Sequence, residues 1–143
     1  MLISDFEDRI KRHEGFRSRV YSDSLGIPTI GYGHNLRTGL PQEILEIIFQ
    51  LDLKQAYEDF IFRFPDKYKR HLNDVRKSVI IELIFNMGLK SLMAFKNMLS
   101  ALERGDFETA SKELLDSKYA KQVGERCAVL AKLLRSGREE DHV

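Results

Sequence analysis

The segment 79–87 limits the fold of this chain more than any other part of the sequence. It reads Val-Ile-Ile-Glu-Leu-Ile-Phe-Asn-Met, so apolar side chains would occur nearly all the way round a helix. Such a helix has to be surrounded by other parts of the protein. A chain of 143 residues can form one domain with one principal core. We therefore expect a mainly helical protein with 79–87 as its buried central helix and Gly88 as the C-cap of that helix.

The rest of the chain contains further helices and one short region of β-structure. Apolar spacing predicts a first helix that ends at Glu14, and a long helix over 41–62. Strand-forming residues and glycines alternate over 19–34, which predicts two short strands around a turn at 22–26. Shorter helices are expected over 95–104, 107–116 and 124–135, the last with an apolar stripe of Val123, Cys127, Leu130 and Leu134.

Charge and cysteine content exclude some classes of protein. Lys and Arg number 23 and Asp and Glu number 22, a net charge of +1. So small a charge attracts a polyanion weakly, which disfavours nucleic acid as the main partner. The single cysteine, Cys127, cannot form an intramolecular disulfide, and we expect it to be a small core residue. No apolar run is long enough for a signal peptide or a membrane span, so we expect a cytosolic protein without stable membrane insertion.

Two carboxylic acids, Glu14 and Asp23, are candidates for chemistry. Glycoside hydrolysis needs one carboxyl group that protonates the leaving oxygen and a second that activates water or attacks the sugar. Glu14 stands at the end of a helix and Asp23 in the predicted turn, and two such elements can face each other across a cleft. The spacing alone is weak evidence, because the chain has 22 acidic residues and most acids are solvated surface charges.

The residues around these acids form a longer pattern. Glu14-Gly15 is followed by Tyr21, Asp23, Gly26 and then Thr29-Ile30-Gly31-Tyr32-Gly33-His34. This pattern, E-G…Y-x-D-x-x-G-x-x-T-I-G-x-G-H, resembles the active-site signature of the phage-type lysozymes, the glycoside hydrolase family that includes the T-even phage lysozyme. The segment 84–88 is similar to the central helix of that family, and Arg126 with 134–137 to its C-terminal signature. The resemblance covers nearly the whole chain, with a shorter connection between His34 and the long helix.

The resemblance implies an α+β fold, predominantly helical, of the lysozyme-like two-lobed kind. A small β-hairpin lobe would cover about 15–50, and a larger helical lobe about 1–14 and 51–137. The long helix would join the lobes, and the cleft between them would hold the glycan. The tail 138–143 is polar.

The resemblance also implies an activity. Members of the family are endolysins and muramidases that cleave the β-1,4 bond between N-acetylmuramic acid and N-acetylglucosamine in peptidoglycan, without metal or cofactor. Glu14 matches the general acid, Asp23 the second carboxylate and Thr29 the hydroxyl that helps to place water. We expect a monomer that stays in the host bacterial cytoplasm until it is released to the cell wall or periplasm, and a reaction that inverts the anomeric centre.

Other positions are assigned by the same resemblance. His34 would form a structural ion pair with Asp52, and Arg126 would orient Glu14. Tyr119 stands where relatives often carry tryptophan and would keep a packing role. The positions that match substrate-binding residues are Asn35, Phe85, Asn86, Met98 and Glu113, of which the last two transfers are weak.

Three alternatives stay open at this point. The same fold could be a silent glycan-binding module, although both carboxylates and the threonine are present. The charge runs 11–13 and 67–71 suggest a helical nucleic-acid-binding protein, although such runs are usually solvated faces. A lytic transglycosylase would keep the fold and form an anhydro-sugar.

Overall fold

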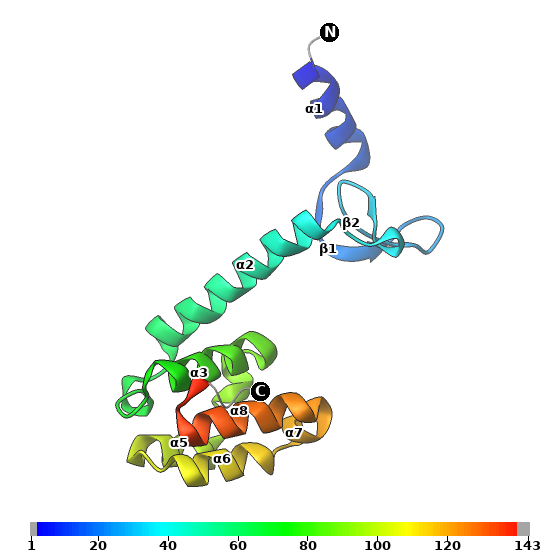
Figure 1. The fold of residues 1–143 in the computed structure, drawn as a ribbon. Helices are drawn as coiled ribbons and strands as arrows, with labels where there is room; N and C mark the ends of the chain where they lie inside the picture. The colour runs from blue at the N-terminus through cyan, green and yellow to red at the C-terminus, as the bar shows by residue number, and fades with distance from the viewer. Residues whose placement is uncertain (1–2, 140–143) are drawn as a thin grey trace. The chain divides into compact units, whose positions relative to one another are not determined.

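The computed structural model describes residues 3–139 and divides the chain into two compact units, Met1–Ile48 and Phe49–Val143. Most of the described residues are helical, and the strands form one small antiparallel sheet (Figure 1). This confirms the predicted α+β, predominantly helical class. The division into a hairpin lobe and a larger lobe that includes the first helix stays a prediction.

The first unit begins with one helix and the sheet. Helix α1 covers Ile3–Glu14, and the strands are β1 Arg17–Ser22, β2 Pro28–Gly31 and β3 His34–Asn35. The sheet order is β1-β2-β3, with Tyr21 opposite Thr29 and Thr29 opposite Asn35. The predicted hairpin is therefore confirmed. The sequence did not predict the third strand, because a strand of two residues is too short to show an alternation of apolar and polar side chains.

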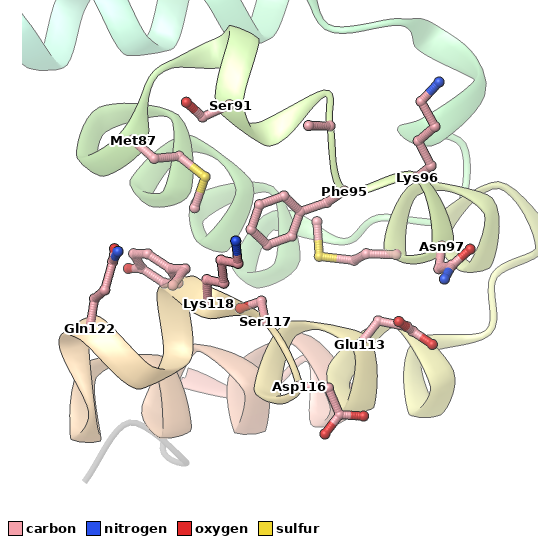
Figure 2. Close-up of a pocket in the computed structure, with 13 residues that line it drawn as sticks. Met87, Ser91, Phe95, Lys96, Asn97, Glu113, Asp116, Ser117, Lys118 and Gln122 are labelled. Carbon is pink, nitrogen blue, oxygen red and sulfur yellow. The ribbon is translucent and has the colours of Figure 1, made fainter.

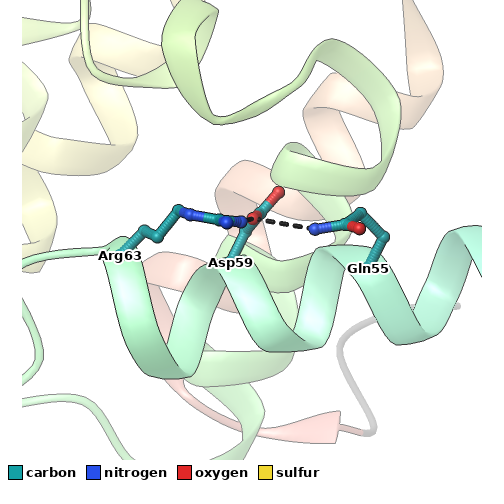
Figure 3. Close-up of polar contacts among 3 residues, drawn as sticks. All are labelled: Gln55, Asp59 and Arg63. Atoms are coloured by element: carbon teal, nitrogen blue, oxygen red, sulfur yellow. Dashed lines mark hydrogen bonds and ion pairs between the residues drawn. The ribbon is translucent and has the colours of Figure 1, made fainter.

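A short 3-10 turn, η1 Leu36–Thr38, leads to α2, Gln42–Glu58, which runs from the first unit into the second. The long helix was predicted to reach 62, and the helical path continues as a π-helical turn, η2 Asp59–Arg63. Phe64 donates its backbone N–H to the Asp59 carbonyl at 2.8 Å, an i to i+5 bond. Gln55 and Arg63 both donate to Oδ1 of Asp59, so three side chains one turn apart support this segment (Figure 3).

The second unit packs its helices around α3, Asp74–Met87. Val79, Ile80, Leu83 and Ile84 are buried, as predicted for the central helix. Helix α3 begins five residues before the apolar segment because Asn73 caps it: Oδ1 of Asn73 accepts the Arg76 backbone N–H at 3.0 Å. The other elements are η3 Asp66–Tyr68, α4 Leu89–Leu92, α5 Lys96–Arg104, α6 Phe107–Leu115, α7 Lys118–Val123 and α8 Glu125–Ser136.

The last helix packs along α6 and α3 (Figure 1). Cys127, Leu130 and Leu134 of the predicted stripe are buried, and Val123 packs against the same core. Burial raises the pKa of the Cys127 thiol, as expected for a small core residue. The buried hydroxyl of Ser111 on α6 donates to the Ala131 carbonyl at 2.9 Å, a direct polar link between α6 and α8.

The C-terminal end of α8 is bound by the start of α3. The Arg76 guanidinium donates from Nε to the Leu134 carbonyl and from Nη2 to the Arg135 carbonyl, both at 2.7 Å. It also lies over the Phe107 ring, 3.6 Å from the centroid. Gly137 has a φ of 67°, which L side chains rarely adopt, and a Cβ there would lie 2.7 Å from Nδ2 of Asn73 and displace that side chain, so glycine is favoured. This explains why the segment 134–137 ends in glycine.

No helix among residues 3–139 combines the length and apolar character needed to cross a membrane.

Candidate active site

Glu14 is the last residue of α1, and its side chain is exposed. The helix ends there because Gly15 adopts a φ of 72°, which L side chains rarely adopt. Gly15 still donates its backbone N–H to the Lys11 carbonyl at 2.9 Å, which closes the last turn. The Glu-Gly pair of the motif thus ends the helix at the candidate acid, and β1 begins shortly after it.

Gly33 lets the Glu14 carboxyl lie close to the backbone between β2 and β3. It has a φ of 91°, and a Cβ built on it would lie 3.0 Å from Oε2 and 3.7 Å from Cδ of Glu14. Any side chain at position 33 would therefore crowd the carboxyl group as well as strain the backbone. Sequence reasoning used this glycine only as part of a motif, and its contact with Glu14 follows from the folded hairpin.

Asp23 is held in the turn between β1 and β2. Its Oδ1 accepts the backbone N–H groups of Leu25 at 2.8 Å and Ile27 at 2.9 Å. Gly26, with a φ of 77°, closes the turn by donating to the Asp23 carbonyl at 2.9 Å. Within residues 3–139, Oδ2 of Asp23 accepts no hydrogen bond. One oxygen of the carboxylate therefore fixes the group, and the other is available to accept a proton from water.

Thr29 lies next to Asp23 through a shared backbone group. Its side chain is 4% exposed, and Oγ1 donates to the Ile27 carbonyl at 2.8 Å. The same carbonyl accepts the Asp23 backbone N–H at 3.0 Å. The hydroxyl donates its only hydrogen to the Ile27 carbonyl. Its oxygen lone pairs can therefore accept a hydrogen bond from another molecule. The peptide groups of Ile27 thus fix Asp23 and Thr29 relative to each other, which the motif spacing alone did not reveal.

His34 and Asn35 both stabilise the loop that follows the hairpin. Nε2 of His34 lies 3.0 Å from the Gly39 carbonyl, and Oδ1 of Asn35 accepts the Arg37 backbone N–H at 2.8 Å. The ion pair of His34 with Asp52 stays a prediction, as does substrate binding by Asn35. Asp52 itself is an exposed residue of α2.

Arg126 pairs with Glu82 in the second unit. The distance between Nε of Arg126 and Oε2 of Glu82 is 3.2 Å, and both side chains are partly exposed. The pair gives the Glu82 carboxylate, which lies on an otherwise apolar helix, an oppositely charged partner. Both residues line a largely apolar cavity of about 570 Å³ together with Phe85 and Phe49, whose rings meet edge to face with centroids 5.6 Å apart. The role of Arg126 toward Glu14 stays a prediction.

The other predicted substrate-binding residues lie apart from that cavity. Asn86 is exposed on α3. Met98 and Glu113 line a second cavity of about 590 Å³ (Figure 2). Met98 is only 1% exposed, whereas Glu113 is half-buried and carries the polarity at this position.

Tyr119 is 7% exposed and belongs to the core, which confirms its packing role. Its hydroxyl is buried and has no hydrogen-bond partner in the described part of the chain. Burial is the largest influence on this phenol and raises its pKa, with Arg126 acting in the opposite direction. No sequence signal predicts an unsatisfied hydroxyl, because it depends on the fit of neighbouring side chains.

The basic run 67–71 is not a single free surface. Lys69 is largely buried, pairs with Asp66 at 3.3 Å and lies over the Phe60 ring. Lys67 lies over the ring of Tyr68, 5.1 Å from the centroid. The ion pair with Asp66 offsets the charge of Lys69, so the run offers less unpaired positive charge to a nucleic acid than its sequence suggests.

Comparison with known proteins gives consistent matches. A family model described as phage lysozyme matches residues 11–140. An endolysin of Salmonella phage P22 is 36% identical over 78% of this chain and 80% of the phage protein. An endolysin of Acyrthosiphon pisum secondary endosymbiont phage 1 is 32% identical over 82% of this chain and 80% of its own length. The probable T4-type lysozyme 1 of Dictyostelium discoideum is 25% identical over 95% of this chain and 96% of its own length.

Proposed function

Because this chain belongs to the phage lysozyme family, and is therefore a glycoside hydrolase that degrades peptidoglycan, we propose that Glu14, Asp23 and Thr29 are its catalytic residues. The bond cleaved would be the β-1,4 linkage between N-acetylmuramic acid and N-acetylglucosamine. The observation that supports the proposal most strongly is the attachment of Asp23 and Thr29 to the same residue, Ile27, which leaves acceptor atoms on both side chains.

The chemistry can be derived from these groups. Glu14, in its protonated form, gives its proton to the glycosidic oxygen as the bond to the anomeric carbon breaks. A water molecule between Asp23 and Thr29 gives one hydrogen bond to Oδ2 of Asp23 and the other to Oγ1 of Thr29. As the water oxygen bonds to the anomeric carbon, Asp23 takes its proton. This water attack inverts the anomeric centre and leaves Glu14 ionised and Asp23 protonated, and exchange with solvent restores both.

Gly33 has a supporting part in this proposal. The proton donor has to approach the glycosidic oxygen to within hydrogen-bond distance. The absence of a Cβ at position 33 gives the Glu14 carboxyl room beside the backbone. A larger residue there would displace the carboxyl while Asp23 and Thr29 stayed in place.

Substitution of Glu14 tests the proposal. Glu14→Gln keeps the size of the side chain but removes the transferable proton, so the variant should retain its unfolding temperature and lose nearly all lysis of bacterial walls in a turbidity assay. The matched control is Glu7→Gln, an exposed glutamate on the same helix, which should lyse walls at the normal rate. Wild-type lysis by Glu14→Gln would refute the assignment.

Analysis of the product tests the bond and the reaction type. Mass spectrometry of digested walls should find N-acetylmuramic acid at the new reducing end, formed with the addition of water. An anhydro-sugar would identify a transglycosylase instead. Wall binding without any new reducing end would identify a silent glycan-binding module.

A further inference from the structure

Two exposed aromatic side chains lie beside the candidate proton donor, and the proposed hydrolysis does not use them. Phe16 follows Glu14 by two residues. Tyr32 directly precedes Gly33, the residue next to which the Glu14 carboxyl lies. The two rings meet with centroids 5.1 Å apart and planes inclined at 49°. Their exposed fractions are 64% for Phe16 and 46% for Tyr32, so both keep large faces open. This pair of rings is named the aromatic patch below.

An ammonium group stands beside the aromatic patch. Nζ of Lys11 lies 5.5 Å from the centroid of the Tyr32 ring, a distance at which a cation is attracted to a ring face. Lys11 precedes Glu14 by three residues on α1, so the two side chains project from one side of that helix. Lys11 forms no ion pair within residues 3–139, so its N–H donors are available to a ligand.

The patch borders a cavity of about 400 Å³ along β1, named the β1 cavity below, which Phe16 and Tyr21 both line. Arg17 belongs to the same lining, and its guanidinium lies 5.0 Å from the centroid of the Tyr21 ring. The strand is irregular at this place, because residues 18–20 lie opposite Ile30 alone. Such bulges bend a strand and are common next to active sites. The hollow along β1 therefore has aromatic rings and hydrogen-bond donors in its wall.

Aromatic faces with hydrogen-bond donors at their edges fit a sugar ring. The C–H groups on one face of a pyranose can lie against an aromatic face, which carries partial negative charge. The hydroxyl and acetamide oxygens at the rim of the sugar can then accept hydrogen bonds from Lys11 or Arg17. A lipid chain would cover the rings but leave both cations without acceptors. The motif T-I-G-x-G-H leaves position 32 open, so the signature does not itself require a ring there.

On this basis we propose that the aromatic patch and the β1 cavity form a sugar-binding subsite of the first unit, in which Phe16 and Tyr32 stack on a ring of the glycan near the bond that Glu14 protonates. The inference rests on the proposed function, since it takes the wall glycan as the substrate. The two rings would hold the strand without exchanging a proton with it. They would therefore govern the affinity for glycan and leave the chemical step unchanged.

Fluorescence tests this inference separately from catalysis, because the chain contains no tryptophan. Tyr32→Trp, combined with Glu14→Gln, places a single indole in the patch. The probe is wall glycan stripped of peptide by an amidase and made soluble by sonication. Its addition should shift the emission to shorter wavelength in a saturable manner as the sugar excludes water from the indole. The matched control is Phe62→Trp in the same background, at a ring of η2 that is 80% exposed, whose emission should not change.

Two results of this titration would overturn the inference. One is an emission from the patch that glycan does not alter at concentrations tenfold above the KM of the wild-type enzyme. The other is an emission that is already typical of a buried indole before glycan is added, which would mean that the protein itself covers the patch.

Ring-removing variants test the subsite in the turnover reaction. Phe16→Leu and Tyr32→Leu keep an apolar side chain but lose the flat face, so each should raise KM about two- to tenfold with kcat unchanged. Tyr32→Trp restores a flat face and should bring KM back to near the wild-type value. The matched control is Phe62→Leu, which should leave both constants unchanged. A purely structural role of Tyr32 would instead lower the unfolding temperature of Tyr32→Leu and leave its KM near wild type, which would contradict the inference.

The outcomes separate the subsite from the catalytic assignment. If glycan shifts the indole emission while Glu14→Gln alone still lyses walls, the assignment of Glu14 fails and the subsite stands. If Glu14→Gln abolishes lysis while Phe16→Leu and Tyr32→Leu keep the wild-type KM, the assignment of Glu14 stands and the subsite is overturned.

Discussion

The hairpin of the first unit and the helical core of the second are held in shape by different kinds of interaction. In the hairpin, the defining contacts are polar: a turn carboxylate, a buried hydroxyl and glycines with positive φ. In the second unit they are apolar, and every buried hydrophobic residue among the described side chains lies between Ala56 and Leu134. Two of the groups that shape the hairpin, the Asp23 carboxylate and the Thr29 hydroxyl, are also groups that we assign to catalysis. A substitution there should affect turnover first, whereas one in the core should affect stability first.

The largest expected effect is on turnover, in Asp23→Asn. The amide keeps an oxygen that can accept the N–H groups of Leu25 and Ile27, so the turn should persist, but the amide cannot take a proton from water. Loss of general-base assistance should lower kcat by about 10²- to 10⁴-fold, with a change in unfolding free energy of about 0.5 kcal/mol or less. Hydrolysis of soluble wall fragments and urea denaturation measure the two quantities.

A second variant at the same position completes this test. Asp23→Ala also removes the turn acceptor, so it should lose about 1–2 kcal/mol of stability in addition to activity. Normal turnover by Asp23→Asn would show that the carboxylate serves the turn alone. The comparison between the two units would then lose its basis.

The opposite expectation applies to Leu83 in the core. This side chain is fully buried on α3, and Leu83→Ala would leave a cavity that the packed helices cannot close. The unfolding free energy should fall by about 2–5 kcal/mol, while the kcat of the folded molecules stays near the wild-type value. Urea denaturation at 25 °C and initial rates at the same temperature check this. A fall in kcat as large as that of Asp23→Asn would show that the core and the active site are not separable.

The success of sequence reasoning differed between the two regions for the same physical reason. The helices of the second unit could be predicted because burial imposes a repeating apolar pattern, as in 79–87. Caps and short helices were not predicted, among them the start of α3 at Asn73 and the helices α4 and α7. Such segments are too short to show the repeating apolar spacing from which a helix is predicted. For the hairpin, the motif identified Asp23 and Thr29 but not their common attachment to Ile27. Nearly every residue type has the same backbone N–H and C=O groups, so the sequence does not show which of them accepts or donates such a hydrogen bond.

Gly33 connects backbone shape with turnover, and Gly31 supplies a matched control. Both have positive φ, 91° and 70°, so alanine strains the backbone at either position by about 1 kcal/mol. Only at Gly33 would the new Cβ approach Glu14, at 3.0 Å from Oε2, whereas at Gly31 nothing lies within 4 Å. Gly33→Ala should therefore lose about tenfold more kcat than Gly31→Ala at a similar loss of stability, since ~1.4 kcal/mol of misplacement corresponds to tenfold. Equal kcat values would mean that the contact with Glu14 has no part in catalysis.

The smallest expected effect comes from Tyr119, the polar exception within the apolar core. Its buried hydroxyl has no partner, so Tyr119→Phe should leave the stability at pH 7 unchanged or raise it by about 1 kcal/mol. Burial raises the phenol pKa in the folded state above its ordinary value of about 10. Its contribution to stability is therefore complete below about pH 10 and is lost as the pH rises through the folded-state pKa. In urea denaturation from pH 8 to 11, the unfolding free energy of Tyr119→Phe should fall less steeply with pH than that of wild type. The matched control is Tyr57→Phe, at an exposed tyrosine of the same unit, which should follow wild type. Parallel curves for all three proteins would show that burial does not raise the pKa of the Tyr119 phenol in the folded state.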